Sequence, residues 1–301
     1  MAWRPFEEST LVDYIVFVLA PQILHGLVWG IVIAFIALGL TIVFGLMDIV
    51  NFAHGELYML GAFFGYSLLF LVHNFWIALV LAMIVLGLMG ILIEVIMFRP
   101  LYGRDPIFHL LLTFGIGMIF REGARLLWGG ETKRVDVPIA GAVDILGVTY
   151  PIYRLMILGI GILILIIIWF ALNKTETGAI MRGASQDREM SSALGINVTR
   201  VYTLTFATGA ALAALAGVLM APIYFVYPTM GIDAILRAFI VVIVGGMGSL
   251  TGAVVASLLI GEVESLASLW ISPTWAETLV FVALIITMIV KPTGLFGKAK
   301  R

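Results

Sequence analysis

Few residues of this sequence have side chains that do chemistry. The 301 residues contain no cysteine, and the four histidines have no metal-ligand spacing: His25, His54, His73 and His109. Without cysteine there are no disulfides, thiolate metal sites or cysteine nucleophiles. We find no Ser/His/Asp arrangement of a hydrolase, and no Gly-x-x-x-x-Gly-Lys-Ser/Thr loop that would cradle a nucleotide phosphate. We therefore expect a protein that is not an enzyme, with no catalytic residues, no metal site and no cofactor of its own.

Ionisable residues that fall within or near apolar stretches form a second group of candidates. A charge inside a membrane is costly, so such residues usually mark a functional or a paired site. Arg237 follows Asp233 by four residues, which favours a structural ion pair on one helix face. Glu262 and Glu264 are two residues apart and cannot share one helix face, so at least one is expected to meet a cavity or a partner subunit.

The elements that must position these residues are membrane helices. Apolar residues make up 62% of the chain and charged residues 12%, against about 25% charged in soluble domains, and the mean hydropathy is +1.14. About 20 apolar residues cross a bilayer as a helix. The predicted fold is all-α, a polytopic transmembrane helical bundle. We predict nine spans, over residues 23–45, 56–72, 76–98, 107–128, 153–172, 201–222, 233–247, 252–270 and 275–290. Residues 11–20 are a shorter apolar segment, either a tenth span or an interfacial helix.

The basic residues orient these spans, because loops on the cytoplasmic side of a membrane carry an excess of lysine and arginine. With nine spans, ten of the 17 basic residues fall on one side, in the loop 99–106, the segment 173–200 and the C-terminal tail. Segment 121–154 holds five on the other side, together with acidic residues, and is interpreted as a folded outer loop. The C-terminus is therefore predicted to be cytoplasmic.

A weak internal repeat relates two segments that lie near opposite faces in this topology. Residues 50–63 and 226–239 match without a gap at five positions: Val50/Val226, Gly55/Gly231, Leu60/Leu236, Ala62/Ala238 and Phe63/Phe239. The chain would then be a single transmembrane domain over 1–301, with a first repeat at 23–128, a linking span and cytoplasmic segment at 153–200, and an inverted second repeat at 201–290. Inverted repeats are typical of transporters, with the pathway at the repeat interface. The alternative is chance similarity between two helix starts.

Segment 173–200 is the longest polar interruption on the predicted cytoplasmic side. Thr175 or Thr177 is a candidate helix cap. Residues 187–193 are predicted to form a short helix that stops at Gly195 in the left-handed conformation. Its apolar face would consist of Met190, Ala193 and Leu194, a shape suited to a groove on a soluble partner. The alternative is a solvated loop with scattered charge.

Several motifs together resemble the permeases of branched-chain amino-acid ABC importers, and most closely the shorter, first type of permease. They are IALGLTIVFG at 36–45, IVNFAHGE at 49–56, MLGA at 59–62, RGASQD at 182–187, ALGIN at 193–197 and GGMGSLTGA at 245–253. The resemblance covers nearly the whole chain. It implies a type II ABC importer fold in a bacterial inner membrane, and uptake of branched-chain amino acids or a related small carboxylate or amide solute.

The same resemblance implies that the chain works in a complex. Its partners would be a second homologous permease, two cytoplasmic ATPase subunits that hold ATP and Mg, and a periplasmic solute-binding protein. No nucleic-acid partner is expected, since the net charge is −1. The solute itself is not identified, because the binding protein would set much of that choice.

Two sets of residues are expected to carry the function. The segment 178–195 resembles the family's coupling region for the ATPase, with Gly178, Arg182, Gln186, Asp187, Glu189, Met190, Leu194 and Gly195 as its candidate residues. The pathway candidates lie at the paired turns and the late glycine motif: Thr41, Asn51, His54, Gly55, Glu56, Gly231, Gly246, Gly248 and Ser249. Helix starts near Gly55 and Gly231 could stabilise a passing carboxylate weakly, because helix N-termini favour anions. For Asn51 and His54, a hydrogen-bonded turn that holds the helix break is an equal alternative.

Other functions remain open at this level. A proton-coupled secondary transporter would work alone and would use Glu56, Glu94 or His54 as relay groups. Glu94 lies about one turn from Arg99, so an ion pair explains it more simply than a relay. A channel with a re-entrant filter at residues 245–248 is a third possibility.

Overall fold

The computed structural model describes residues 14–145 and 147–297 of the chain. Residues 11–13 of the predicted segment 11–20 lie outside the described residues, as do the basic tail residues Lys298, Lys300 and Arg301. The sheet in the described chain is a two-stranded hairpin, β1 (Ala142–Ile145) paired antiparallel with β2 (Val148–Pro151). The remaining regular structure of this part is helical, so the predicted all-α class is confirmed.

Eight helices of the described chain are long and apolar enough to cross a membrane. Their bounds agree with the predicted spans to within a few residues, except that the first begins at Ile15 rather than at residue 23. They are α2 (Ala20–Met47) with the π turn η1 (Ile15–Leu19), α3 (His54–Val72), α4 (Phe75–Ile93) with η2 (Glu94–Phe98) and η3 (Arg99–Leu101), α5 (Pro106–Trp128), α6 (Ile152–Lys174), α9 (Val198–Met220), α11 (Leu250–Ala267) and α12 (Pro273–Val290). Residues 15–20 run directly into α2 and form neither a tenth span nor a separate interfacial helix. Pro21 does not break this helix, because it lies in the first turn of α2, where proline is tolerated.

Helix α2 is the centre of the bundle. Of the 18 most apolar consecutive residues of the span formed by η1 and α2, 83% are buried inside the molecule. For the same stretch of α6 and of α12 the share is only 11%. A helix that is apolar all round has no preferred exposed face and can be surrounded by other helices. Helices α9, α11 and α10 (Met230–Gly245) pack around α2, while α6 and α12 form the periphery and leave most of their apolar surface uncovered.

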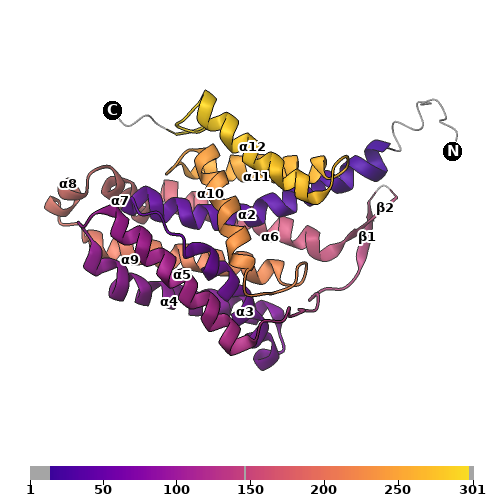
Figure 1. Ribbon diagram of the computed structural model, residues 1–301, viewed down its shortest axis with the longest axis horizontal. Coiled ribbons are helices and arrows are strands. Elements are labelled where there is room, and N and C mark those ends of the chain that lie inside the picture. The colour runs from indigo at the N-terminus through magenta and orange to yellow at the C-terminus, as the bar shows by residue number, and fades with distance from the viewer. Residues whose placement is uncertain (1–13, 146, 298–301) are drawn as a thin grey trace.

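The two ends of the long axis differ in what they carry (Figure 1). One end holds the short helices α7 (Glu176–Gln186) and α8 (Arg188–Ala193), and we call it the α8 end. There Leu46 of α2 packs with Ala184 of α7 and with Tyr202 near the start of α9. The other end holds β1 and β2, and we call it the hairpin end. There Ile145 and Val148 lie against the first turns of α2.

Helices α3 and α10 start inside the bundle rather than at its ends. A ring nitrogen of His54 lies 3.1 Å from the carbonyl oxygen of Ile36, which precedes the end of α2 by 11 residues, about 16 Å of helix. Helix α10 has 16 residues, about 24 Å, which is shorter than the ~30 Å hydrocarbon core. The predicted seventh span, 233–247, is therefore wrong as a full helical crossing. Segments 48–53 and 221–229 enter the bundle as non-helical chain, and their apolar composition hid this from hydropathy.

The predicted outer loop 121–154 is shorter in the structure. Helix α5 continues to Trp128, so Arg121 and Glu122 are helical. The remainder, 129–151, ends in the β1–β2 hairpin and is fastened by an isolated bridge between Lys133 and Val226. Their backbone N–H groups donate to each other's carbonyl oxygens at 2.8 and 2.9 Å. This bridge joins the loop after α5 to the non-helical segment before α10.

Candidate functional site

The starts of α3 and α10 meet in the interior of the molecule. A Cβ added to Gly55 would contact the carbonyl oxygen of Gly231 and would lie 2.6 Å from Cβ of Ile235. A Cβ added to Gly231 would lie 2.7 Å from the carbonyl oxygen of Gly55. Only residues without a side chain allow this approach of two backbones. Contact between the two segments is what the predicted inverted repeat requires at its interface, although the division into two repeats stays a prediction.

Each of these helix starts already carries a carboxylate. Glu56 lies in the first turn of α3 and Asp233 in the first turn of α10. Acidic side chains at helix N-termini are stabilised by the positive end of the helix dipole. A passing carboxylate would therefore have to compete with Glu56 at the start of α3 and with Asp233 at the start of α10.

Glu56 is held by an arginine from another helix. Its side chain is buried, and Oε1 accepts a hydrogen bond from Nε of Arg121 at 3.1 Å and a second from Nη2 of the same guanidinium. Its other oxygen, Oε2, has no hydrogen-bond partner in the described chain and would be 2.5 Å from a Cβ placed on Gly231. The pair links the start of α3 to the second half of α5.

The other pathway candidates near this point are buried. His54 contacts the Ile36 carbonyl, as expected of a group that holds the helix break. Both side-chain atoms of Asn51 and the hydroxyl of Thr41 are enclosed without a hydrogen-bond partner among the described residues. The backbone carbonyl of Asn51 accepts from the N–H of His54 at 3.3 Å, which closes the turn before α3.

The late glycine motif forms the turn between α10 and α11 at the α8 end. Gly246 and Gly248 adopt positive φ values of 105° and 81°, which side-chain-bearing residues rarely adopt. The Ser249 hydroxyl accepts from the N–H of Gly252 at 3.1 Å and caps α11. Residues 295 and 296 donate backbone hydrogen bonds to the carbonyls of Val244 and Gly245 at 2.8 and 2.9 Å. These contacts make the motif a packed turn and give no support to an open filter.

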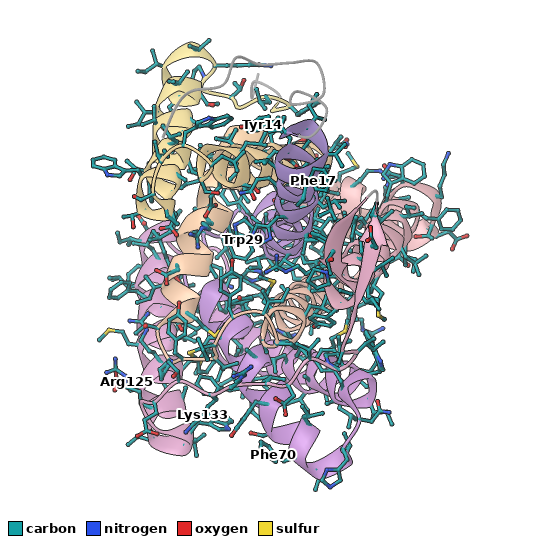
Figure 2. The ribbon with its side chains drawn as sticks, turned by 90° about the vertical axis from the view of Figure 1, so that its right-hand side faces the viewer. Tyr14, Phe17, Trp29, Phe70, Arg125 and Lys133 are labelled. Atoms are coloured by element: carbon teal, nitrogen blue, oxygen red, sulfur yellow. The ribbon has the colours of Figure 1, made fainter. Side chains whose placement is uncertain are left out.

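A cavity of about 530 Å³ lies on the hairpin-end side of the two helix starts. Its wall comes from α2, α3, α10, α11, α12 and the segment before α10, through His25, Trp29, Ile33, Ile36, Tyr58, Tyr224, Phe225, Tyr227, Met230, Asp233, Ala234, Arg237, Glu264, Ser265, Ser268, Pro273, Ala276 and Glu277. Viewed onto the hairpin end, Trp29 lies near the centre of the molecule (Figure 2). None of the nine predicted pathway residues lines the cavity, but Met230 directly precedes Gly231, and Tyr58 follows Glu56 by two residues.

Arg237 is the ionic centre of this cavity. Its Nη2 lies 2.6 Å from Oε1 of Glu277 and 3.2 Å from Oε1 of Glu264, and its guanidinium stands 5.3 Å from the ring of Trp29. The predicted pair with Asp233 is not formed as a salt bridge; Asp233 instead accepts from the Tyr227 hydroxyl at 3.2 Å. The prediction considered only one helix face, whereas α11 and α12 bring two glutamates to the same guanidinium.

The two glutamates of α11 face different surroundings, as their spacing required. Glu264 lines the cavity and accepts from the Trp29 indole N–H at 3.1 Å, so the expectation that at least one of the pair meets a cavity is confirmed. Glu262 lies against α2, where a Cβ on Gly26 would be 2.8 Å from its Cδ. Its Oε1 is buried without a hydrogen-bond partner in the described chain.

The coupling candidates occupy two short helices at the α8 end. Thr175 caps α7, as one of the two predicted caps, by accepting from the N–H of Gly178 at 3.2 Å. Asp187 caps α8 by accepting from the N–H of Met190 at 2.9 Å. The predicted short helix is confirmed as α8, and Gly195 has the expected positive φ, 84°. The predicted cap gave only the start of α7; its extent, Glu176–Gln186, was not predicted.

Some of these candidates contact α6, and others point outward. Gly178 packs against the end of α6, where Arg182 donates to the carbonyl oxygen of Leu172. Met190 and Leu194 point outward, with 58% and 75% of their surface exposed. Gln186, Asp187 and Glu189 are exposed beside them. An apolar pair exposed beyond the ends of the long helices is suited to contact with another protein.

A chain of contacts connects α8 to the long helices. The Arg188 guanidinium lies 5.8 Å from the ring of Tyr102 and 5.4 Å from that of Tyr202. The Tyr102 hydroxyl donates to Oε1 of Glu94 at 2.6 Å. Burial, reinforced by this hydrogen bond, raises the pKa of Tyr102 above its usual range, so the hydroxyl keeps the proton that it donates.

Glu94 is fully buried and has three partners. Arg99 donates to it at 2.9 Å, which confirms the predicted ion pair, and the Thr203 hydroxyl of α9 donates to it at 2.7 Å. Arg99 also donates to Thr203 at 2.9 Å. The carboxylate therefore joins the end of α4 to the first turns of α9.

Sequence reasoning missed most of the cavity wall, in particular Trp29, Tyr58, Tyr224, Tyr227 and Glu277. Their signal was present: two tyrosines three residues apart come shortly before a helix that carries an internal arginine. An arginine inside an apolar helix needs carboxylates from neighbouring helices. The sequence could therefore indicate that partners exist, but it could not say which helices supply them.

Comparison with known proteins gives a match along almost the whole chain. Residues 22–289 match the family model described as branched-chain amino acid transport system / permease component. The chain is 30% identical over 294 residues to the high-affinity branched-chain amino acid transport system permease protein LivH of Salmonella typhimurium, covering 92% of this chain and 95% of that protein. It is 29% identical over 292 residues to the permease protein BraD of Pseudomonas aeruginosa, with the same two coverages.

A more distant similarity extends to sugar permeases. The fructose import permease protein FrcC of Rhizobium meliloti is 28% identical over 135 residues, which cover 42% of this chain and 38% of that protein. No solved structure matches the chain.

Proposed function

The chain belongs to the branched-chain amino acid transport system permease family, and we propose that it forms half of the membrane pathway of an ATP-driven importer. The solute would be leucine, isoleucine, valine or a related small carboxylate or amide. The observation that carries the proposal is the family match over residues 22–289, which includes every helix that lines the cavity and both short helices of the α8 end. Membership of this family makes the chain a multi-pass membrane permease that works with ATPase and binding-protein components.

The proposed assembly is one copy of this permease with a second homologous permease, two ATPases and a periplasmic binding protein. Helices α6 and α12 have uncovered apolar surfaces, which would be in contact with lipid or with the second permease. ATP and Mg would be held by the ATPases.

The proposed orientation places the α8 end in the cytoplasm of a bacterial cell, with the C-terminus on the same side. This end carries Arg104, Lys174, Arg182, Arg188 and Lys291, and cytoplasmic loops favour such residues. The cavity, on the hairpin-end side, would then be reached from the periplasm. In this arrangement the ATPases would push on α8, and Arg188, Tyr102 and Glu94 would carry the displacement to α4 and α9.

The test is ATP-driven uptake by the reconstituted complex, with Leu194→Asp as the diagnostic variant. Leu194 is 75% exposed, so a carboxylate in its place should leave the permease folded. The same carboxylate should weaken the contact of α8 with the ATPase. We expect ATP hydrolysis to continue while leucine uptake falls at least tenfold. Ser192→Asp adds the same charge to an exposed position of α8 outside the Met190–Leu194 face and should transport normally. Normal uptake by Leu194→Asp would remove the coupling assignment.

The proton-coupled alternative is not supported. The family members named above are permeases of transport systems, and the groups that a relay would need are engaged. Glu94 is bonded to three side chains, Glu56 to Arg121, and His54 to a backbone carbonyl. Uptake by this chain alone, driven by a pH gradient in proteoliposomes, would restore the alternative.

A further inference from the structure

The cavity beside Arg237 has an excess of negative charge. Three carboxylates line it, those of Asp233, Glu264 and Glu277, against the single guanidinium of Arg237. His25 does not balance them: its Nδ1 lies 2.8 Å from Nη1 of Arg154, and a guanidinium can only donate, so the imidazole is the acceptor and is neutral. The lining residues therefore carry a formal charge of −2, and Arg154 behind His25 reduces the excess to −1.

Two of these carboxylates retain an oxygen that faces no partner in the described chain. Both oxygens of Glu264 are engaged, one by Arg237 and one by the Trp29 indole. Glu277 uses only Oε1, toward Arg237, and Asp233 uses only Oδ2, toward Tyr227. Oδ1 of Asp233 and Oε2 of Glu277 are left as acceptors in the cavity wall.

An independent sign of a ligand is the hydroxyl of Tyr58. This residue is 5% exposed, it lines the cavity, and its hydroxyl forms no hydrogen bond with any described residue. The hydroxyl is open to the cavity, so a solute or water there would supply the partner that tyrosine hydroxyls at buried positions usually have. A hydroxyl both donates and accepts, so it can serve either end of a zwitterion.

Apart from Ser265 and Ser268, the rest of the wall is apolar or aromatic. Trp29, Ile33 and Ile36 come from successive turns of α2, and Met230 and Ala234 face them from α10. A volume of about 530 Å³ falls in the range of small-molecule sites, roughly 300–1,000 Å³. Polar acceptors grouped beside an apolar wall suit a small solute with a charged head and a hydrocarbon side chain.

We infer that this permease itself recognises the ammonium group of its substrate, through Asp233 and Glu277, with the hydrocarbon side chain against the α2–α10 wall. The inference deepens the proposed function and rests on it. An ammonium brings three donors and a positive charge to a lining with spare acceptors and an excess of negative charge. A solute with only a carboxylate would face repulsion from three carboxylates and would find one guanidinium already shared by two of them.

The experiment compares three ligands of similar side chain on the assembled complex in nanodiscs, without the binding protein. L-leucine carries both charged groups, 3-methylbutylamine only the ammonium, and 4-methylpentanoate only the carboxylate. Binding is followed by calorimetry and by quenching of Trp29, with Trp29→Phe to identify its signal. We expect leucine and the amine to bind, and the acid to bind at least tenfold more weakly. Equal or tighter binding of the acid overturns the inference.

The variants Asp233→Asn and Glu277→Gln keep shape and remove charge. Each should weaken leucine and the amine by about tenfold, the usual loss for a hydrogen bond to a charged group, without weakening the acid. Glu262→Gln is the matched control, because Glu262 is on the same bundle but outside the cavity wall, and it should change nothing. Unchanged amine binding in the doubly substituted protein refutes the assignment. If a charge variant fails to assemble, the order of the three ligands on the unaltered complex decides the matter.

A second assay separates this inference from the proposed function. ATP-driven uptake of leucine with the binding protein present tests only whether the complex is a branched-chain amino-acid importer. Amine-selective binding without such uptake would refute the proposed solute and leave the ammonium site standing. ATP-driven leucine uptake by a complex that binds the amine and the acid equally well would refute the ammonium site and leave the proposed solute standing.

Discussion

Replacing Gly55 by alanine tests the contact between the starts of α3 and α10. The added Cβ would lie 2.6 Å from Cβ of Ile235 and against the carbonyl oxygen of Gly231. Carbon atoms rest at about 3.5–4.0 Å, so the two helices must separate by about 1 Å. Overpacking of this kind costs about 1–3 kcal/mol, whereas alanine within a helix gains about 0.5–1 kcal/mol over glycine. The expected result is a net loss of roughly 1–2 kcal/mol.

The assay is thermal unfolding of the purified complex together with ATP-driven uptake. A loss of 1 kcal/mol lowers the Tm of a chain of this general size by about 2–4 °C, so Gly55→Ala should lower it by several degrees and reduce uptake. The matched control is Gly123→Ala in α5, where an added Cβ meets nothing within 4 Å. That change should leave the Tm unchanged or raise it.

A double substitution makes the test sharper. Gly231→Ala alone should also destabilise, because its Cβ would lie 2.5 Å from Oε2 of Glu56. Once Gly55→Ala has separated the helices, the second alanine should cost less than it does alone, since changes at residues in contact are not additive. The reasoning is refuted if Gly55→Ala melts and transports like the unaltered protein, or if the two alanines add independently.

Three further changes test other contacts of the structure. Arg121→Met should cost about 3–5 kcal/mol, because it leaves the buried Glu56 carboxylate without its counter-charge; denaturation of the purified complex measures this. Tyr102→Phe keeps the ring under Arg188 but removes a donor to Glu94, so we expect a loss of about 1–3 kcal/mol and less uptake per ATP hydrolysed. Gly246→Ala should lower expression and Tm strongly, because a positive φ of 105° coincides with contact against residues 293–297.

Each of these three changes has a matched control. Arg125→Met removes an arginine whose ion pair with Glu122 is exposed, so its effect should stay below about 1 kcal/mol. Tyr202→Phe removes a hydroxyl that makes no hydrogen bond in the described chain and should be near neutral. Gly103→Ala has a similar positive φ, 80°, but nothing within 4 Å, so it isolates backbone strain of about 1–2 kcal/mol from crowding. A control that destabilises the complex as much as the change it is matched to would contradict the structural reason given for that change.

The sequence was most informative where chemistry is local along the chain. The cap at Thr175, the stop of α8 at Gly195 and the pair of Glu94 with Arg99 all involve residues a few positions apart. Apolar length also predicted the long helices well, because about 20 apolar residues suffice to identify a crossing.

The sequence was least informative about depth and about contacts between distant helices. Hydropathy placed the start of α3 near one face, but the non-helical residues before it are as apolar as the helix, so nothing marked them as an entry into the interior. Arg237 found its carboxylates at Glu264 and Glu277, 27 and 40 residues further along the chain. Arg121 likewise found Glu56 across 65 residues. No spacing rule along one helix can identify such partners.

The central position of α2 has a consequence for how the protein is made. Its main neighbours, α9 and α11, begin at Val198 and Leu250, so about 200 residues are translated between the end of α2 and the start of α11. At ~5–20 residues per second, the ribosome needs roughly 10–40 s for that stretch. Until α9 and then α11 have been synthesised, the sides of α2 that they cover in the finished protein face lipid or an insertion factor. Because α2 is apolar on every side, it is stable in lipid during this time. A charged substitution in α2 would be exposed to lipid before its partner is synthesised, even if the finished bundle could pair it.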